Sequence, residues 1–175
     1  MKKYIAILIA FVIILSSCGI SAGSSTVTIT LPATLFEGQS ESDIIEEAKS
    51  KDIIAVKNND GSYDYTMPKS THEKLLKDFK KSIDDSIEDI VNGDTFTSYI
   101  DIKYNNDVTK FSLYVNQDEF ENNLFARFAV FGLSIMALFY QSFNGVKSDD
   151  LKVNYELINN DTDIVYDTFI YPDFN

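Results

Sequence analysis

Hydrophobic and polar residues alternate with a period of two in several short segments of this chain. The alternation is clearest in residues 111–115 and 153–157. A period of two with one polar face predicts strands of antiparallel sheets that bury only one side. We expect three hairpins, which pair residues 53–57 with 62–67, 100–104 with 110–115, and 152–158 with 164–171.

Each predicted hairpin turns at a similar tetrapeptide. The three are Asn-Asn-Asp-Gly at 58–61, Asn-Asn-Asp-Val at 105–108 and Asn-Asn-Asp-Thr at 159–162. Asn, Asp and Gly suit tight turns because they tolerate positive φ or hydrogen-bond to their own backbone. The likeness of the turns has two interpretations, a threefold internal repeat at a spacing of about 50 residues or coincidence.

A helix is predicted before each hairpin. The first runs from about Glu41 to Lys51, with Ser40 or Ser42 as its N-cap. The second begins at a capping box, in which Ser70 satisfies free N–H groups of the first turn and Glu73 is its partner. It ends at residues 92–93, with glycine in the left-handed conformation. Its apolar residues recur every three or four positions and predict one stripe: Leu75, Leu76, Phe79, Ile83, Ile87, Ile90 and Val91.

The third predicted helix is the most apolar. It starts near Asn116 or Asp118 and ends at Asn144-Gly145, and residues 128–140 within it are apolar nearly all round. Such a helix is either buried or in a membrane. The apolar run is short for a membrane span, which needs about 20 residues. We therefore expect a core helix, and insertion of the apolar helix 124–143 into a membrane or a partner is the alternative.

These elements predict an α+β fold in which antiparallel β-hairpins pack on helices in the order β-(α-β-β)₃, with a central apolar helix. An opening strand at residues 26–31 completes the order. About 150 residues suit one domain with a core of its own. We expect this single α+β domain to cover residues 26–175.

The first 18 residues predict how the protein is held at a membrane. Lys2 and Lys3 precede an apolar run at residues 5–15, and Leu15-Ser16-Ser17-Cys18 follows. This resembles the lipobox of bacterial lipoproteins, with Ser17 where Gly or Ala is commoner. Residues 1–17 are then a signal peptide, and the Cys18 thiol, the only one in the chain, takes the lipid. The alternative is an ordinary secretory peptide cut near residues 21–23.

The residues after the lipidation site are small and polar. Residues 18–25 are expected to form the lipidated cysteine and a flexible tether. Two acyl chains provide stable anchoring, so the membrane is the first expected partner and the location is the extracytoplasmic side of the cell membrane.

The mature chain is strongly acidic. Removing Lys2 and Lys3 with the signal leaves 13 basic and 27 acidic residues, a formal charge of −14. So much negative charge argues against nucleic acid as a partner and against electrostatic docking on anionic lipid. A protein or cell-wall partner stays open.

Residues with catalytic or metal-binding chemistry are sparse. His72 is the only histidine, and we expect it exposed in the first turn of its helix without zinc partners. Carboxylates cluster at residues 84–94, where a bridged cation or a solvated helix face are the alternatives. Five lysines at residues 69–81 form either a basic ridge or pairs such as Lys80–Asp84 and Lys81–Asp85. No motif of a hydrolase or nucleotide-binding protein occurs, so we expect neither a cofactor nor a metal.

Four segments give the chain a family resemblance. They are Val-Thr-Ile-Thr-Leu-Pro at 27–32, Tyr-Thr-Met-Pro-Lys-Ser-Thr-His at 65–72, Tyr-Gln-Ser-Phe-Asn-Gly at 140–145 and Tyr171-Pro172. The mature chain resembles small lipoproteins of low-GC Gram-positive bacteria that are often labelled as antigen I/II N-terminal-like domain proteins. The resemblance implies the membrane anchor and the architecture, and no activity.

Three functions are compatible with these observations. The first is a lipid-anchored extracytoplasmic protein that acts as a non-catalytic binding or interaction module. The second is a membrane-active or immunity-type lipoprotein that uses the apolar helix. The third is an enzyme of wall polymers, which would need two carboxylates at a defined separation in a cleft.

Overall fold

The computed structural model describes residues 25–123 and 125–172 of the chain. This part folds into an α+β structure with two sheets, and the predicted order β-(α-β-β)₃ is confirmed. The elements are β1 (Thr26–Leu31), η1 (Ala33–Phe36), α1 (Glu41–Ser50), β2 (Ile54–Lys57), β3 (Tyr63–Pro68), α2 (Lys69–Asn92), β4 (Tyr99–Tyr104), β5 (Lys110–Val115), α3 (Gln117–Asn122), η2 (Ala126–Val130), α4 (Phe131–Phe143), η3 (Ser148–Asp150), β6 (Val153–Asn159) and β7 (Ile164–Tyr171), where η marks a short 3₁₀ helix. All three predicted hairpins form within one or two residues of their predicted ends.

Sheet A contains the opening strand and the first hairpin. Its strand order is β1-β3-β2, and all pairs are antiparallel. Alternation decides which side is buried, because Tyr63, Tyr65 and Met67 of β3 point to the inner face and are buried while Asp64 and Thr66 point out.

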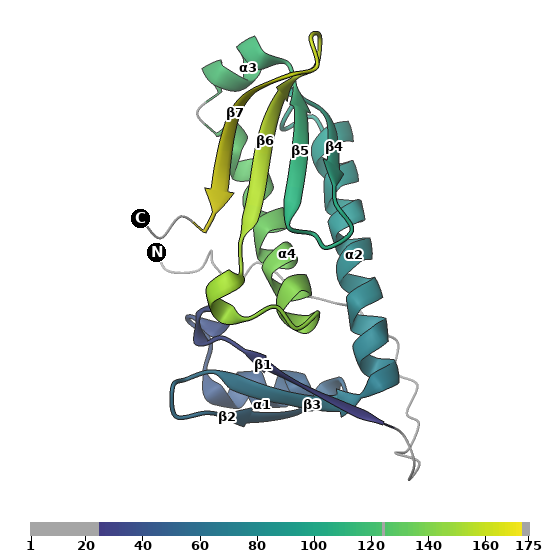
Figure 1. The fold of residues 1–175 in the computed structure, drawn as a ribbon, viewed down its shortest axis with the longest axis vertical. Coiled ribbons are helices and arrows are strands. Elements are labelled where there is room, and N and C mark those ends of the chain that lie inside the picture. The colour runs from purple at the N-terminus through teal and green to yellow at the C-terminus, as the bar shows by residue number, and fades with distance from the viewer. Residues whose placement is uncertain (1–24, 124, 173–175) are drawn as a thin grey trace.

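Sheet B contains the second and third hairpins in the order β4-β5-β6-β7. The two hairpins join through β5 and β6, which are parallel, whereas the outer pairs are antiparallel. The first hairpin lies in the other sheet, so the three hairpins occupy non-equivalent positions in the fold (Figure 1).

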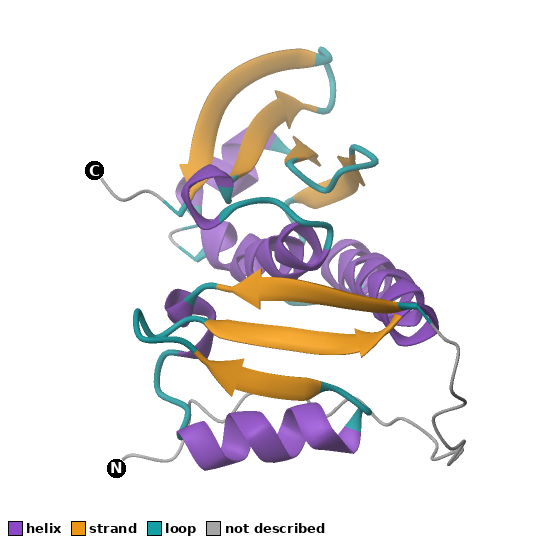
Figure 2. Ribbon diagram, turned by 60° about the horizontal axis from the view of Figure 1, so that its bottom comes forward, coloured by secondary structure: helices purple, strands orange, loops and turns teal. Residues whose placement is uncertain are grey.

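Two long helices connect the sheets. Helices α2 and α4 run side by side in opposite directions along one face of sheet B, and one end of each reaches the inner face of sheet A (Figures 1 and 2). The larger apolar core lies between these helices and sheet B, and a smaller one lies between sheet A, α1 and the helix ends. Leu35, Leu76 and Phe79 pack against both cores and join them.

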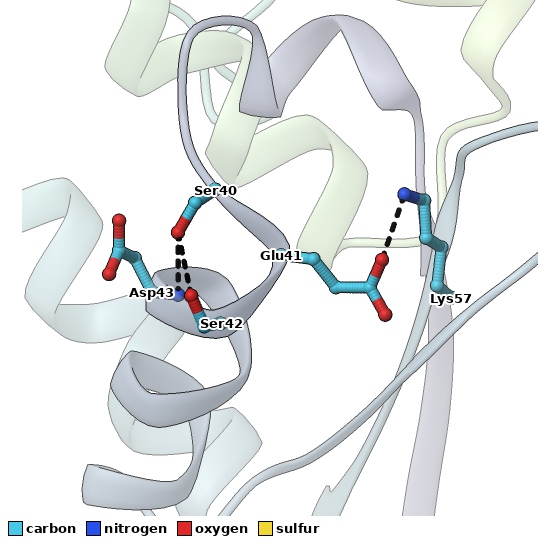
Figure 3. A network of polar contacts seen from close by, with 5 residues as sticks. All are labelled: Ser40, Glu41, Ser42, Asp43 and Lys57. Carbon is cyan, nitrogen blue, oxygen red and sulfur yellow. Dashed lines mark hydrogen bonds and ion pairs between the residues drawn. The ribbon is translucent and has the colours of Figure 1, made fainter.

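The start of α1 agrees with the sequence. Ser40 is the N-cap, and its Oγ accepts a hydrogen bond of 3.2 Å from the Asp43 backbone N–H (Figure 3). Ser42 contacts Ser40 through its hydroxyl instead of capping. Glu41 forms an ion pair of 3.0 Å with Lys57, which fastens the start of α1 to the end of β2.

The second helix ends where predicted, at Asn92 with Gly93 after it, but its predicted start and the predicted conformation of Gly93 are wrong. The helix starts at Lys69, directly after β3, and no side chain caps it. The backbone N–H of Lys69 donates to the carbonyl of Ser25, the residue before β1. This hydrogen bond holds Lys69 at the end of sheet A, and the helix therefore starts one residue before Ser70. At the other end, Gly93 is extended with φ −82° rather than left-handed. Glycine is required there because a Cβ would lie 2.4 Å from the Asp89 carbonyl oxygen.

The predicted third helix is three helices. Helix α3 is capped by Asn116, whose Oδ1 accepts from the Glu119 N–H, and it ends at Asn122. The Asn123 side chain then accepts from the Phe125 N–H, and this local bond competes with helical pairing and breaks the helix. The predicted end is correct, since Gly145 has φ +86° after α4 and closes it with two backbone hydrogen bonds, Gly145 N–H to Ser142 and Val146 N–H to Gln141.

The central apolar helix is confirmed in α4. Leu133 and Ala137 are fully buried, and Leu138 nearly so, in the larger core. Gln141 is also buried, and its side-chain amide donates to the carbonyls of Val108 and Lys152. Val108 has φ +53°, an unfavourable value for a β-branched residue. The glutamine and the surrounding core therefore hold a strained turn in place.

Candidate functional site

An apolar pocket opens on the inner face of sheet A, between α1 on one side and α2 and α4 on the other. Its walls come from every element around it: Leu31, Phe36, Ala48, Ile53, Tyr65, Leu75, Phe79, Phe139 and Phe143. The cavity has a volume of about 80 Å³. A cavity of about 150 Å³ accepts benzene, so this pocket suits a group of only a few carbon atoms.

The alternation and helical periodicity of the sequence build these walls. Tyr65 points inward because it alternates with the outward Asp64 and Thr66 on β3. Phe79 stacks on Phe139 at 6.1 Å between ring centroids, and it meets Phe143 at 5.1 Å. The aromatic side chains of α2 and α4 thus form a wall opposite Ala48 of α1.

The rim of the pocket is polar. Gln39, Glu47, Lys51 and Asp78 surround the opening. Lys51 Nζ donates to Glu47 Oε1 at 2.6 Å, and the lysine is only partly exposed. Burial, with a smaller contribution from Glu47, raises the pKa of the Tyr65 phenol well above its usual value. Tyr65 is therefore neutral at physiological pH and offers a hydroxyl group rather than a phenolate.

The predicted lipidation site, Cys18, lies outside the described residues. So do residues 1–17 and most of the predicted tether. The structure therefore bears on the folded domain and leaves the anchor a prediction.

His72 is placed differently from its prediction. It is half-buried, and its Nε2 lies 2.6 Å from the Phe143 carbonyl oxygen. This contact ties the first turn of α2 to the last turn of α4, so the side chain has a structural contact rather than full exposure. The correction follows from the close approach of the two helix ends at sheet A.

The predicted acidic cluster is spread along the exposed side of α2. Within the residues that the structure describes, no group of three or more His, Cys, Asp or Glu side chains is arranged to hold a metal ion. Asp84 accepts a hydrogen bond of 2.7 Å from the Tyr104 hydroxyl. The cluster thus helps to join α2 to β4.

The lysines of α2 are mostly neutralised locally. Lys81 pairs with Asp85 as predicted, and two further pairs, Lys69–Glu73 and Lys74–Asp78, have the same spacing. The predicted Lys80–Asp84 pair does not form. Lys80 instead donates to the Asn106 carbonyl and lies over the Tyr140 ring.

The apolar segment has one exposed side. Residues Ala126–Phe143 are long and apolar enough to cross a membrane, but 56% of this stretch is buried in the fold. The exposed part lies at the start of this stretch and just before it, where Phe125, Phe128 and Phe131 are 68%, 67% and 53% exposed. If the alternative of insertion into a membrane or a partner holds, the inserting side chains are therefore these three phenylalanines.

The sequence did not predict the pocket. Which helix stands beside which depends on contacts between residues far apart in the chain, and the local pattern does not contain these contacts. The comparisons add no relative, since no protein-family model, no curated protein and no solved structure matches this chain.

Proposed function

We propose that this protein is a lipid-anchored extracytoplasmic protein of the cell surface that acts as a non-catalytic binding or interaction module. The observation that carries the proposal is the Leu-Ser-Ser-Cys box at residues 15–18, which follows a basic and apolar leader. The resemblance to small Gram-positive lipoproteins supports the same anchor.

The folded domain supports the binding part of this proposal. Its pocket is apolar inside and polar at the rim, the usual composition of a site that binds a small ligand or group. The Tyr65 hydroxyl and the Glu47–Lys51 pair can form hydrogen bonds to a bound group and so orient it.

Metabolic labelling with a fatty-acid analogue tests the anchor. We expect the wild-type chain to take up label and Cys18→Ala to take up none, while Ser17→Ala, which restores the commoner lipobox, labels normally. Equal labelling of Cys18→Ala and wild type would remove the lipoprotein interpretation.

Photo-crosslinking on intact cells tests the binding role. A photoreactive amino acid in place of Lys51 sits at the pocket rim, and one in place of Lys103 sits on the outer face of sheet B. We expect discrete crosslinked products from position 51 and none from position 103. Equal patterns from the two positions, or no product from either, would contradict a binding role for the pocket.

The exposed phenylalanines favour one second candidate, a membrane-active lipoprotein. Aromatic side chains are typical of membrane–water interfaces. If Phe125, Phe128 and Phe131 enter lipid, chains beginning at Ser24 bind neutral vesicles and the triple serine variant does not. The matched control replaces Ile54 and Val56 of β2, which are as exposed, by serine. The proposed function expects no vesicle binding by any of the three proteins.

A further inference from the structure

The free edge of β1 is the least protected strand edge in the described part of the fold. An edge strand presents unpaired N–H and C=O groups that can pair with another chain, and proteins usually block it with charge, proline or a bulge. The strand Thr-Val-Thr-Ile-Thr-Leu at Thr26–Leu31 contains none of these. It is rich in β-branched residues, which favour the extended backbone that pairing requires.

The hydrogen-bond register shows which groups of β1 point outward. The Lys69 N–H donates to the Ser25 carbonyl, and antiparallel pairs alternate between bonded and non-bonded positions. Val27, Ile29 and Leu31 therefore exchange bonds with β3, whereas Thr26, Thr28 and Thr30 direct their backbone groups to the free edge.

The β2 side gives the same assignment. The Asn58 N–H donates to the Ser62 carbonyl, so the alternate residues of β3, Asp64 and Thr66, pair with β2. Among the described residues, no backbone hydrogen bond reaches the outward groups of Thr28 and Thr30.

An open groove of about 600 Å³ runs beside these groups. Thr28, Ile29 and Thr30 form one wall, and residues 145–148, after α4, contribute to the other. Figure 2 shows β1 as the outermost strand of sheet A, on the side of α4. The groove volume lies within the usual range of ligand sites, about 300–1,000 Å³.

The hydroxyl groups of the groove are largely used within the protein. Thr28 Oγ1 contacts Thr66 Oγ1, and Thr30 Oγ1 donates to Asp64. The Ser62 hydroxyl donates to Asp60, and the Ser142 hydroxyl donates to the Leu138 carbonyl. What the groove offers a ligand is therefore main-chain groups at strand spacing rather than free hydroxyls, which selects a polypeptide over a sugar.

The other strand edges are obstructed. On β7, the outward Thr168 N–H donates to the Asp167 carboxylate, which also binds Arg127. The edge of β4 has a bulge between Tyr99 and Asp101, and β2 is short, with α1 fastened beside it.

We infer that an extended segment of a partner protein binds along β1 as a fourth strand of sheet A, with its backbone paired to Thr28 and Thr30. Main-chain pairing at a free edge is an established mode of peptide recognition. A second copy of the chain is disfavoured because each mature copy has a charge of −14. The inference rests on the proposed function in one respect, the location of the site near the membrane. If Cys18 is anchored, the seven residues between it and β1 span about 25 Å at most, so the edge of β1 stays close to the membrane surface.

A proline scan of the outward positions tests the inference on the chain as cells produce it, in nanodiscs if it carries a lipid and in buffer if it does not. Random dodecapeptides displayed on phage are the probe, and selected peptides are then synthesised and titrated. Thr28→Pro removes one outward N–H but leaves the β3 pairing intact, because proline is tolerated where the N–H of an edge strand faces out. Thr28→Val keeps the N–H and is the matched control, and Thr30→Pro repeats the test at a second position.

We expect selected peptides to bind wild type and Thr28→Val equally and each proline variant about tenfold more weakly. Melting temperatures of the free proteins show whether each variant folds. If Thr28→Pro does not fold, the peptide affinity of Thr30→Pro decides the test. Hydrogen exchange of residues 26–31 slows in the wild type on binding.

Three results would overturn the inference. They are the absence of any enriched peptide, equal binding by the folded proline variants, and protection of β1 by wall oligosaccharides or by a second copy of the chain instead of a peptide. The outcome is separable from that of the anchor, because peptide binding with unlabelled Cys18 would remove the membrane location alone.

Discussion

Sheet A and sheet B bury their helix-facing sides to different degrees. In sheet B, Phe111, Leu113, Tyr155 and Leu157 are completely buried beneath α2 and α4. In sheet A, α1 and the ends of the long helices share one face and leave a pocket between them. Sheet A also has the free edge of β1. The difference supports our proposal that sheet B maintains the structure and sheet A offers the surfaces for binding.

The largest effect is expected in the core behind sheet B. Leu133→Asp places an unpaired charge at a fully buried position of α4, at a cost of several kcal/mol against a total stability of about 5–15 kcal/mol. We expect no cooperative unfolding transition in circular dichroism of the chain beginning at Ser24. The control is Phe131→Asp on the exposed side of the same helix, which should still unfold cooperatively. A folded Leu133→Asp protein would mean that α4 is not central.

A smaller loss is expected when the buried amide of α4 is removed. Gln141→Leu leaves the buried Val108 carbonyl and the partly buried Lys152 carbonyl without this donor, and an unsatisfied buried group costs about 1–3 kcal/mol. We expect the free energy of unfolding to fall by about 3 kcal/mol in urea titrations. Ser142→Ala, which removes one bond within the helix, should lose about 1 kcal/mol or less. Equal losses would show that the amide does not support the Val108 turn.

Enlarging a small side chain compares the two regions directly. Ala137→Leu overfills the sheet B core and should cost about 1–3 kcal/mol. Ala48→Leu projects into the sheet A pocket and should leave stability unchanged or raise it by about 1 kcal/mol. The measurement is the urea midpoint of each variant. A larger loss for Ala48→Leu would show that the pocket is already filled by its walls.

The smallest effect concerns helix starts, where sequence and structure disagree. Ser40→Ala removes the cap of α1 and should cost about 1 kcal/mol. Ser70→Ala lies inside α2 without a capping bond and should change little. Equal losses of stability for the two variants in thermal melts would show that Ser70 caps the helix, as the sequence predicted.

The sequence predicted element order and hairpins because alternation and turn residues are local properties. It failed where longer-range pairing decides the outcome. Lys69 bonds to Ser25, a residue of a distant segment, and this contact moves the start of α2. The hydrogen bond between the Asn123 side chain and the Phe125 N–H breaks the third predicted helix. The apolar pattern continues on the far side of Asn123 and therefore predicted one unbroken helix.

The pocket and the free edge of β1 were less predictable than the fold. The pocket needs Ala48, Phe79 and Phe139 from three helices, and nothing local sets their proximity. The β1 edge had one local signal, a β-branched strand without charge or proline. Its position at the edge of sheet A emerged only from the pairing with β3.

Amide hydrogen exchange along β1 tests the central contrast most directly, because it needs no ligand. In the unbound protein, Thr28 and Thr30 should exchange rapidly, and Val27, Ile29 and Leu31 should exchange slowly through their bonds to β3. Beside the β5–β6 pair of sheet B, the N–H groups of Asn154 and Asn160, which donate to the carbonyls of Thr109 and Val115, should be slow. Slow exchange at Thr28 and Thr30, equal to that of Ile29, would contradict an open edge and with it the assignment of sheet A as the binding side.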